Sequence, residues 1–176
     1  MYRVPVRLDD LLRSLADLDR RQALETKSGG CPCGGPLHDA TWQRKPRGVD
    51  LPEALCTRWG LCCGKCRKRK LPPSVLFAGR RVYLKAVMLL VVAARQRDRA
   101  NTSMSRLRRL FGVSTKTIGR WVRAFLEGLS LAPQWLRVRG RIPATVRDVD
   151  VPSALLALHA DAMQALRLAC VLVPDL

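Results

Sequence analysis

Acidic residues and histidines are scarce in this chain. It holds 14 Asp and Glu against 32 Lys and Arg over 176 residues, so its formal net charge is +18. Such an excess repels itself in a compact protein, and proteins usually carry it because their partner is a polyanion. Nucleic acid is the commonest such partner, and an anionic membrane surface is the weaker alternative.

Long hydrophobic runs are absent too. The longest apolar stretch, 82–94, is interrupted by Lys85 and is well short of the ~20 residues that a bilayer span needs. The first fifteen residues carry several charges and lack the apolar core of a secretory signal. We therefore expect a cytoplasmic, nucleoid-associated protein without a membrane partner, in which cysteine thiols stay reduced.

Several kinds of catalytic centre lack the residues that they require. His38 and His159 are the only histidines, and their separation excludes a nickase built on a His-hydrophobic-His motif. No His-x-Glu motif accompanies the cysteines, which argues against a zinc-dependent deaminase. We expect a protein that is not an enzyme.

Apolar residues recur at helical spacing through much of the chain. This pattern predicts a mainly α fold with a small β zinc ribbon and a helix-turn-helix. The expected elements are an amphipathic helix at 8–24, strands at about 37–44 and 55–61, a largely buried helix at 74–95, helices at about 103–110 and 114–127, an irregular basic stretch at 135–150 and a final helix at 152–171. Asn101 or Thr102 is the expected cap of the 103–110 helix.

These elements divide the chain into five segments. They are an N-terminal amphipathic helix (1–27), a zinc ribbon (28–73), a buried helix with a charged linker (74–100), a helix-turn-helix (101–130), and a basic arm with a C-terminal helix (131–176).

Four of the seven cysteines are spaced as metal ligands. Cys31 and Cys33 form one short pair, and Cys63 and Cys66 form a second, so two tight knuckles can place four thiolates in a tetrahedron around Zn²⁺. Because four cysteines close the coordination shell, the predicted Zn²⁺ is structural rather than catalytic. The first pair is one residue shorter than the usual Cys-x-x-Cys, which leaves other ligands open. These alternatives are Cys62, Cys56 and His38.

Residues 104–125 follow the pattern of a helix-turn-helix. Gly112 lies where the tight turn between the helices requires a flexible backbone, and Ser114 is placed to cap the second helix. The residues expected to face inward are Leu107, Leu110, Phe111, Val113, Ile118, Trp121, Val122 and Phe125. One position departs from the usual pattern, because Arg108 stands four places before the glycine, where a small residue normally lets the helices cross.

The outward face of the second helix carries short polar and long basic side chains, which suit base edges and phosphates in a major groove. The predicted DNA contacts on it are Ser114, Thr115, Lys116, Thr117, Arg120 and Arg123, with Gly119 on the same face.

Two further basic runs suit an electrostatic footprint on nucleic acid. The first comprises Lys65, Arg67, Lys68, Arg69 and Lys70, of which Lys68 and Arg69 are predicted DNA contacts. In the second, Arg137, Arg139 and Arg141 alternate before Pro143, and we expect an extended arm that lies along a DNA backbone or groove.

These motifs together resemble the zinc-ribbon plus helix-turn-helix DNA-binding proteins of bacterial mobile elements, which are similar to the front ends of insertion-sequence transposases. The resemblance covers roughly 28–130 and is carried by the two cysteine pairs, the Leu61-Cys-Cys-Gly-Lys-Cys-Arg run and the segment around Gly112. It implies double-stranded DNA as the partner and Zn²⁺ on the four cysteines. The 46 residues after Ser130 are too few for the nuclease domain of such transposases, since domains rarely fall below ~50 residues. We therefore expect an accessory or derivative that lacks that domain.

Two other functions remain open from the sequence. One is a transcriptional regulator unrelated to mobile elements, and the other is a non-enzymatic subunit of an RNA-containing complex. Aromatic residues make up only 5% of the chain, which disfavours the stacking platforms typical of single-stranded RNA recognition. Since tight specific DNA binding usually needs two half-sites, we expect a homodimer or a larger complex. The leucine-rich faces at 8–24 and 152–171 are candidate contacts, although each suits an intramolecular core better.

Overall fold

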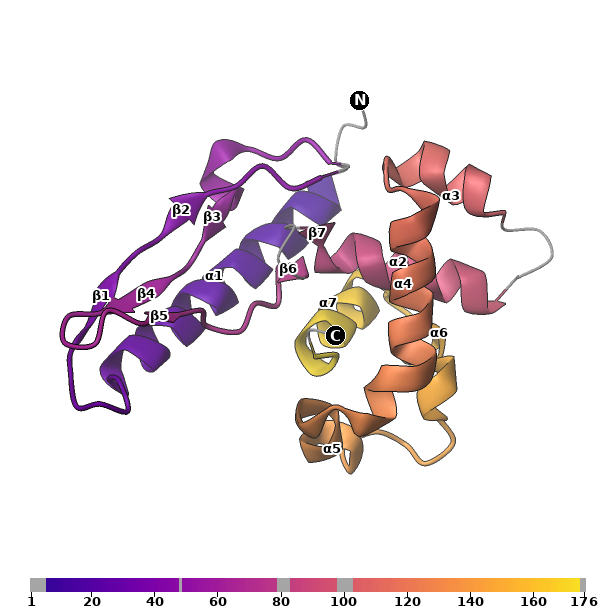
Figure 1. Ribbon diagram of the computed structural model, residues 1–176. Coiled ribbons are helices and arrows are strands. Elements are labelled where there is room, and N and C mark those ends of the chain that lie inside the picture. The colour runs from indigo at the N-terminus through magenta and orange to yellow at the C-terminus, as the bar shows by residue number, and fades with distance from the viewer. Residues whose placement is uncertain (1–5, 48, 79–82, 98–102, 175–176) are drawn as a thin grey trace.

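The computed structural model describes residues 6–47, 49–78, 83–97 and 103–174. It is mainly helical with three small antiparallel sheets among these residues (Figure 1), which confirms the expected mainly α class. No helix in these ranges combines the length and the apolar character needed to cross a membrane.

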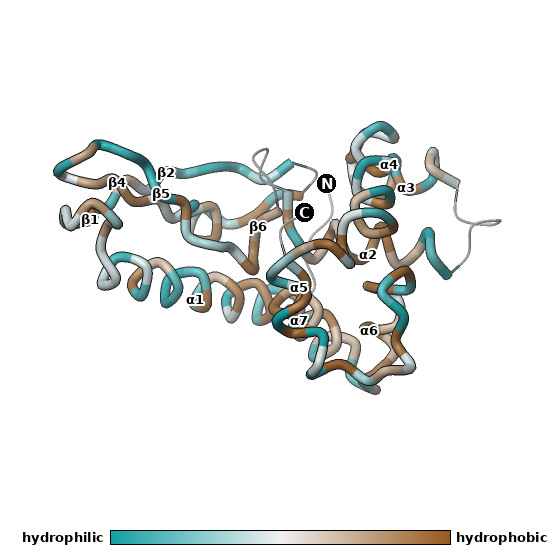
Figure 2. Tube along the Cα trace, turned by 60° about the horizontal axis from the view of Figure 1, so that its bottom comes forward, coloured by the Kyte–Doolittle hydropathy of each residue, from teal (hydrophilic) through white to brown (hydrophobic). Residues whose placement is uncertain are grey.

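The first helix, α1 (Val6–Ser28), runs beside the first five strands (Figure 1). It extends beyond the predicted 8–24, and polar and apolar residues alternate along its length (Figure 2). Its apolar face is buried through Leu11, Leu12 and Leu15, so this part of the leucine-rich face packs inside the molecule. Gly29 and Gly30 follow the helix, and Gly30 has a φ of 66°, a left-handed conformation that glycine adopts at little cost.

Residues 29–73 form the ribbon. Its three-stranded sheet has the order β1 (Leu37–Asp39), β4 (Leu61–Cys63), β5 (Arg69–Lys70), and β2 (Trp42–Gln43) pairs with β3 (Thr57–Arg58) beside it. The predicted strands at 37–44 and 55–61 are thus each divided in two, and Leu55 belongs instead to a 3-10 turn, η1 (Glu53–Leu55).

The predicted helix at 74–95 begins later than expected. Residues 77–78 form β6 (Phe77–Ala78), which pairs with β7 (Tyr83–Leu84), and the helix α2 runs from Lys85 to Arg97. The cause lies in α1, because the buried carboxylate of Asp19 accepts hydrogen bonds from the Ser74 hydroxyl and from the backbone N–H of Val75 and Leu76. These bonds satisfy the backbone donors without a helix.

Two short helices follow, α3 (Met104–Phe111) and α4 (Thr115–Arg123). Ser103 caps α3 by accepting the N–H of Arg106, while the expected caps Asn101 and Thr102 lie outside the described residues. A π turn, η2 (Ala124–Gly128), and a 3-10 turn, η3 (Leu129–Leu131), continue from α4.

The C-terminal segment differs from the expectation in two places. Residues 133–139 form the helix α5 (Pro133–Arg139) rather than irregular chain, because Pro133 starts the first turn and Trp135 is completely buried. After η4 (Asp148–Asp150), the predicted helix at 152–171 is two helices, α6 (Ser153–Ala157) and α7 (Ala162–Leu172). Asp161 separates them by capping α7, where it accepts N–H bonds from Met163 and Gln164.

One large hydrophobic core joins nearly all the helices. It includes residues of α1, α2, α4, α5 and α7, with Trp135, Phe77 and Phe125 as its largest buried side chains. The ribbon has a separate small core of Leu37, Leu61 and Cys63. The basic ribbon and the α3–α4 pair therefore lie at opposite ends of the molecule, with the shared core between them (Figure 1).

Candidate metal centre and nucleic-acid interface

The four predicted metal-ligand cysteines meet at the end of the ribbon. Their sulfur atoms all lie within 4.8 Å of one another. Neighbouring pairs are closer, with 3.4 Å from Cys33 to Cys31, 3.5 Å from Cys33 to Cys63 and 3.7 Å from Cys31 to Cys66. Four convergent thiol ligands at this spacing can hold a metal ion.

Two tight turns bring these sulfur atoms together. Gly35 lies so close to the second knuckle that a Cβ there would be 2.7 Å from both Cys63 Sγ and Lys65 Cβ, so only glycine fits. In the second knuckle the N–H of Arg67 donates to the carbonyl of Cys63, and Arg67 takes a φ of 58°. Both sulfur atoms of the Cys31-Pro-Cys33 pair thus reach the cluster, although this pair is one residue shorter than the usual Cys-x-x-Cys.

Local hydrogen bonds favour the thiolate of Cys63. The backbone N–H of Cys66 donates to Cys63 Sγ at 3.4 Å. This bond, followed by the N–H of Lys65 and the thiols of Cys33 and Cys66, lowers the pKa of Cys63 to about 6. A buried sulfur with a lowered pKa is suited to a cation, because the thiolate is the form that binds metal.

The alternative ligands lie elsewhere. Cys62 precedes Cys63 in β4, so its side chain lies on the opposite face of the strand. Its thiol donates to the carbonyl of Arg67 at 3.6 Å. Cys56 is buried in the main core and donates to the carbonyl of Pro52. His38 pairs with Cys62 across the sheet and contacts the Gly64 turn rather than the sulfur cluster.

The α3–α4 pair separates apolar and cationic side chains. Ile118 and Phe125 are buried, with 0% and 1% exposed, and Trp121 is half-buried with its ring edge-on to Tyr83 at 5.0 Å. The opposite face is open to solvent and carries Ser114, Thr115, Lys116, Arg120 and Arg123. The five exposed side chains lie where the sequence predicted an outward face, and the exposed Glu127 lies 4.0 Å from Arg123.

The turn between these helices has the expected local chemistry. Gly112 ends α3 in the left-handed region at φ 61°, Val113 is buried, and the Ser114 hydroxyl accepts the N–H of Thr117. Thr117 is half-buried and shares a hydrogen bond with the Ser114 hydroxyl at 2.9 Å, so it completes the cap in addition to bordering the exposed face.

Three placements differ from the sequence expectation. Arg108 is exposed, so α3 does not cross α4 at that position. Gly119, expected on the outward face, is half-buried beside Met104, and a Cβ added at 119 would make ordinary van der Waals contact with Met104 Cε at 3.9 Å. Leu110, expected to face inward, is 45% exposed.

The two basic runs have different structures. Lys65, Arg67, Lys68, Arg69 and Lys70 are all exposed at the ribbon end. The predicted extended arm at 137–141 is wrong, because α5 contains Arg137 and Arg139. Arg139 is bound internally: it donates to the carbonyls of Ile142 and Val146 and pairs with Asp148 at 2.8 Å. Arg139 therefore fastens the 142–148 loop and is not available to a phosphate.

Comparison of the chain with models of protein families, with curated proteins and with solved structures finds no match.

Proposed function

We propose that this protein is a non-catalytic binder of double-stranded DNA that places α4 in the major groove. The observation that carries the proposal is the exposed face of α4, where Lys116, Arg120 and Arg123 project from a helix whose other face is buried. Major-groove recognition uses short polar and basic side chains near the start of such a helix. The capped turn at Gly112 and Ser114 supports reading α3 and α4 as a helix-turn-helix.

We propose that the metal on the four cysteines is Zn²⁺ in a structural site. Around tetrahedral Zn²⁺ with Zn–S bonds of ~2.3 Å, neighbouring sulfurs lie ~3.8 Å apart, close to the 3.4–3.7 Å of the three shortest pairs. Such a brace suits the ribbon, since its separate core has three buried residues in the part of the chain that the structure describes. The ion would supply folding free energy to the ribbon, and the cysteines would orient its cationic end.

We further propose, from the resemblance of its motifs to mobile-element proteins, that this binder is an accessory or derivative of a transposase and acts at element ends. A dimer or a larger complex would give it two half-sites. The exposed Lys68 and Arg69 at the ribbon end would add phosphate contacts, which contribute affinity without sequence information.

The proposal is tested by selecting bound duplexes from a random DNA pool with the metal-loaded protein. A recurrent motif is the expected result. Lys116→Ala and Arg120→Ala should each weaken binding to that motif by roughly tenfold or more. Arg20→Ala, which removes an exposed charge from α1, is the matched control and should retain wild-type affinity.

Two results would contradict the proposal. One is a lower melting temperature in the α4 variants that accompanies and accounts for their loss of affinity, since Lys116 and Arg120 would then be structural residues. The other is a preference for structured RNA over every selected duplex in direct competition. A single palindromic motif in promoters, without a partner recombinase, would keep DNA binding and replace the mobile-element role by transcriptional regulation.

A further inference from the structure

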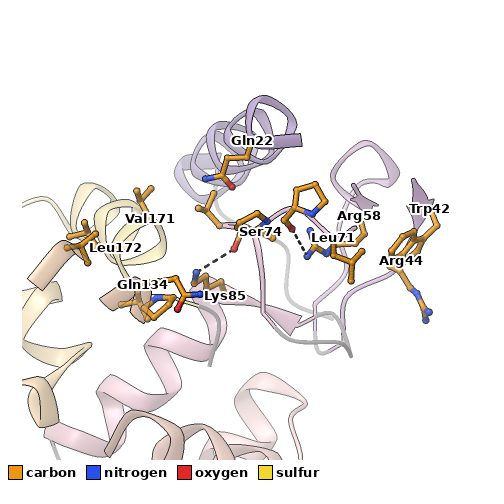
Figure 3. Close-up of a pocket in the computed structure, with 16 residues that line it drawn as sticks. Gln22, Trp42, Arg44, Arg58, Leu71, Ser74, Lys85, Gln134, Val171 and Leu172 are labelled. Carbon is orange, nitrogen blue, oxygen red and sulfur yellow. Dashed lines mark hydrogen bonds between the residues drawn. The ribbon is translucent and has the colours of Figure 1, made fainter. Parts of the chain in front are cut away.

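A cavity of about 550 Å³ lies between the ribbon, α1 and the C-terminal helices. Figure 3 shows its two sides, with Trp42, Arg44 and Arg58 from the ribbon opposite Gln134, Val171 and Leu172. Its volume is within the range of small-molecule sites, roughly 300–1,000 Å³. The cavity is distant from the cysteine cluster and from α4, so neither of the features already described uses it.

The ribbon wall of the cavity is built by strand register. Trp42 lies directly opposite Arg58 in the β2–β3 pair, and Arg44 follows two residues after Trp42. Side chains directly opposite each other in a strand pair project from the same face. The pairing therefore places the Trp42 ring beside Arg58, and Figure 3 shows Arg44 extending outward at the rim.

Gly60 holds the ring of Trp42 in place. A Cβ at 60 would lie 2.5 Å from Cζ3 of Trp42 and 2.8 Å from the Ala40 carbonyl oxygen, so the indole rests against bare backbone. One part of the ring is packed there, while the residue as a whole is only half-buried and lines the cavity. Trp42 is thus a positioned aromatic surface with room beside it.

The polar groups of the cavity favour an anion. Its lining, taken over the described residues, includes Arg44, Arg58 and Lys85 and no carboxylate. Arg58 Nη2 donates to the carbonyl of Pro72, but Nη1 is buried without an acceptor. An anion entering beside Leu71, whose side chain lines the cavity and is 54% exposed, would provide that acceptor.

Two glutamine side chains also line the cavity. Gln22 Oε1 on α1 is buried and has no donor among the residues that the structure describes, and Gln134 on α5 faces it across the cavity (Figure 3). Buried polar atoms without partners are costly, and the N–H edge of a nucleobase would satisfy the glutamine oxygen. Glutamine amides pair well with adenine in particular.

We propose that this cavity binds a purine nucleotide, with the base stacked on Trp42 and the phosphate at Arg58, where Arg44 at the rim adds a second positive charge. The ligand chemistry is a planar base joined to a monophosphate. It can come from a free nucleotide or from the 5′-phosphorylated end of a DNA strand. The site is independent of α4, so it goes beyond the duplex binding proposed above.

The test is calorimetric titration of the full, metal-loaded chain with AMP. We expect saturable binding, and we expect Trp42→Ala and Arg44→Glu each to weaken it about tenfold. Arg44 is exposed, so its reversal leaves the fold intact. Trp59→Ala removes another half-buried indole of the ribbon and Arg20→Glu reverses an exposed charge on α1; neither residue lines the cavity, and both variants should bind as the wild type does.

Absence of saturation below about 10 mM AMP would overturn the proposal. Equal weakening by the control variants would overturn it as well, because binding would then reflect net charge. A second titration distinguishes the two sources of ligand: a 5′-phosphorylated trinucleotide that displaces AMP supports a strand end, and failure to displace it supports a free nucleotide. Lys116→Ala should bind AMP normally, so loss of duplex binding and loss of this site are separate results.

Discussion

At the scale of single residues, the buried carboxylate of Asp19 links α1 to the segment that precedes α2. It is 2% exposed, and burial raises its pKa above the ordinary value of 3.8, against the hydrogen bonds from Ser74, Val75 and Leu76 and the charge of Arg58, which lower it. By binding residues 74–76, the Asp19 side chain keeps them out of the predicted helix, and α2 begins only at Lys85.

The raised pKa of Asp19 predicts a pH dependence of stability. A carboxyl group with a higher pKa in the folded state stabilises most below its unfolded pKa, and that contribution is lost as the pH rises through the folded pKa. The free energy of unfolding of the wild type, relative to Asp19→Asn, should therefore fall as the pH rises from below about 4, the ordinary pKa of an unfolded aspartate, towards neutrality. Urea unfolding of both proteins across this range measures the difference, and a rise would contradict the assigned shift.

The cysteines provide a second prediction at this scale. Cys66→Ser removes one of four convergent sulfurs, so the purified protein should lose its metal and melt at a lower temperature. Cys62→Ser, one residue from Cys63 but on the other face of β4, should keep one metal ion per chain. Elemental analysis with thermal denaturation checks both, and full metal content in Cys66→Ser would reject the ligand set.

At the scale of elements, the turn between α3 and α4 depends on one backbone conformation. Gly112 takes φ 61°, and an L-residue pays roughly 1–2 kcal/mol there. Gly112→Ala should lower the free energy of unfolding by about that amount. Gly128→Ala is the matched control, since Gly128 has φ −104° and nothing within 4 Å of an added Cβ. We expect it to be neutral or to stabilise by about 0.5 kcal/mol, and chemical denaturation of the three proteins compares them.

The elements also show where local signals succeed and where they fail. The predicted boundaries of α3 and α4 agree with the structure to within a few residues, because a cap, a glycine and an apolar repeat all lie within the segment itself. The extended arm and the single C-terminal helix are wrong. Burial of Trp135 accompanies the helix α5, and the Asp161 cap begins α7 as a separate helix. The apolar pattern of the sequence reveals neither effect.

At the scale of the whole molecule, exposed cations lie on the ribbon and on α4, and these two parts are at opposite ends of the molecule (Figure 1). If the ribbon end touches phosphates while α4 reads bases, the two surfaces should respond differently to mutation. Lys68→Ala with Arg69→Ala should reduce the slope of log affinity against log salt by about 1–2 and leave the selected motif unchanged. Titrations at several salt concentrations measure this slope, and an altered motif would assign base contacts to the ribbon.

The sequence by itself determined the features that need no tertiary contact: the net charge of +18, the spacing of the four predicted metal-ligand cysteines and the amphipathic pattern around Gly112. Each arises from composition or short spacing, which a chain carries in any conformation. Only the tertiary structure decided which of Cys62 and Cys63 faces the cluster, because the pairing of β1 with β4 sets the orientation of each side chain. It likewise made strands of residues 77–78 and 83–84, since Asp19 reaches the preceding loop from another helix, and it formed the cavity beside Trp42 by joining segments far apart in the chain.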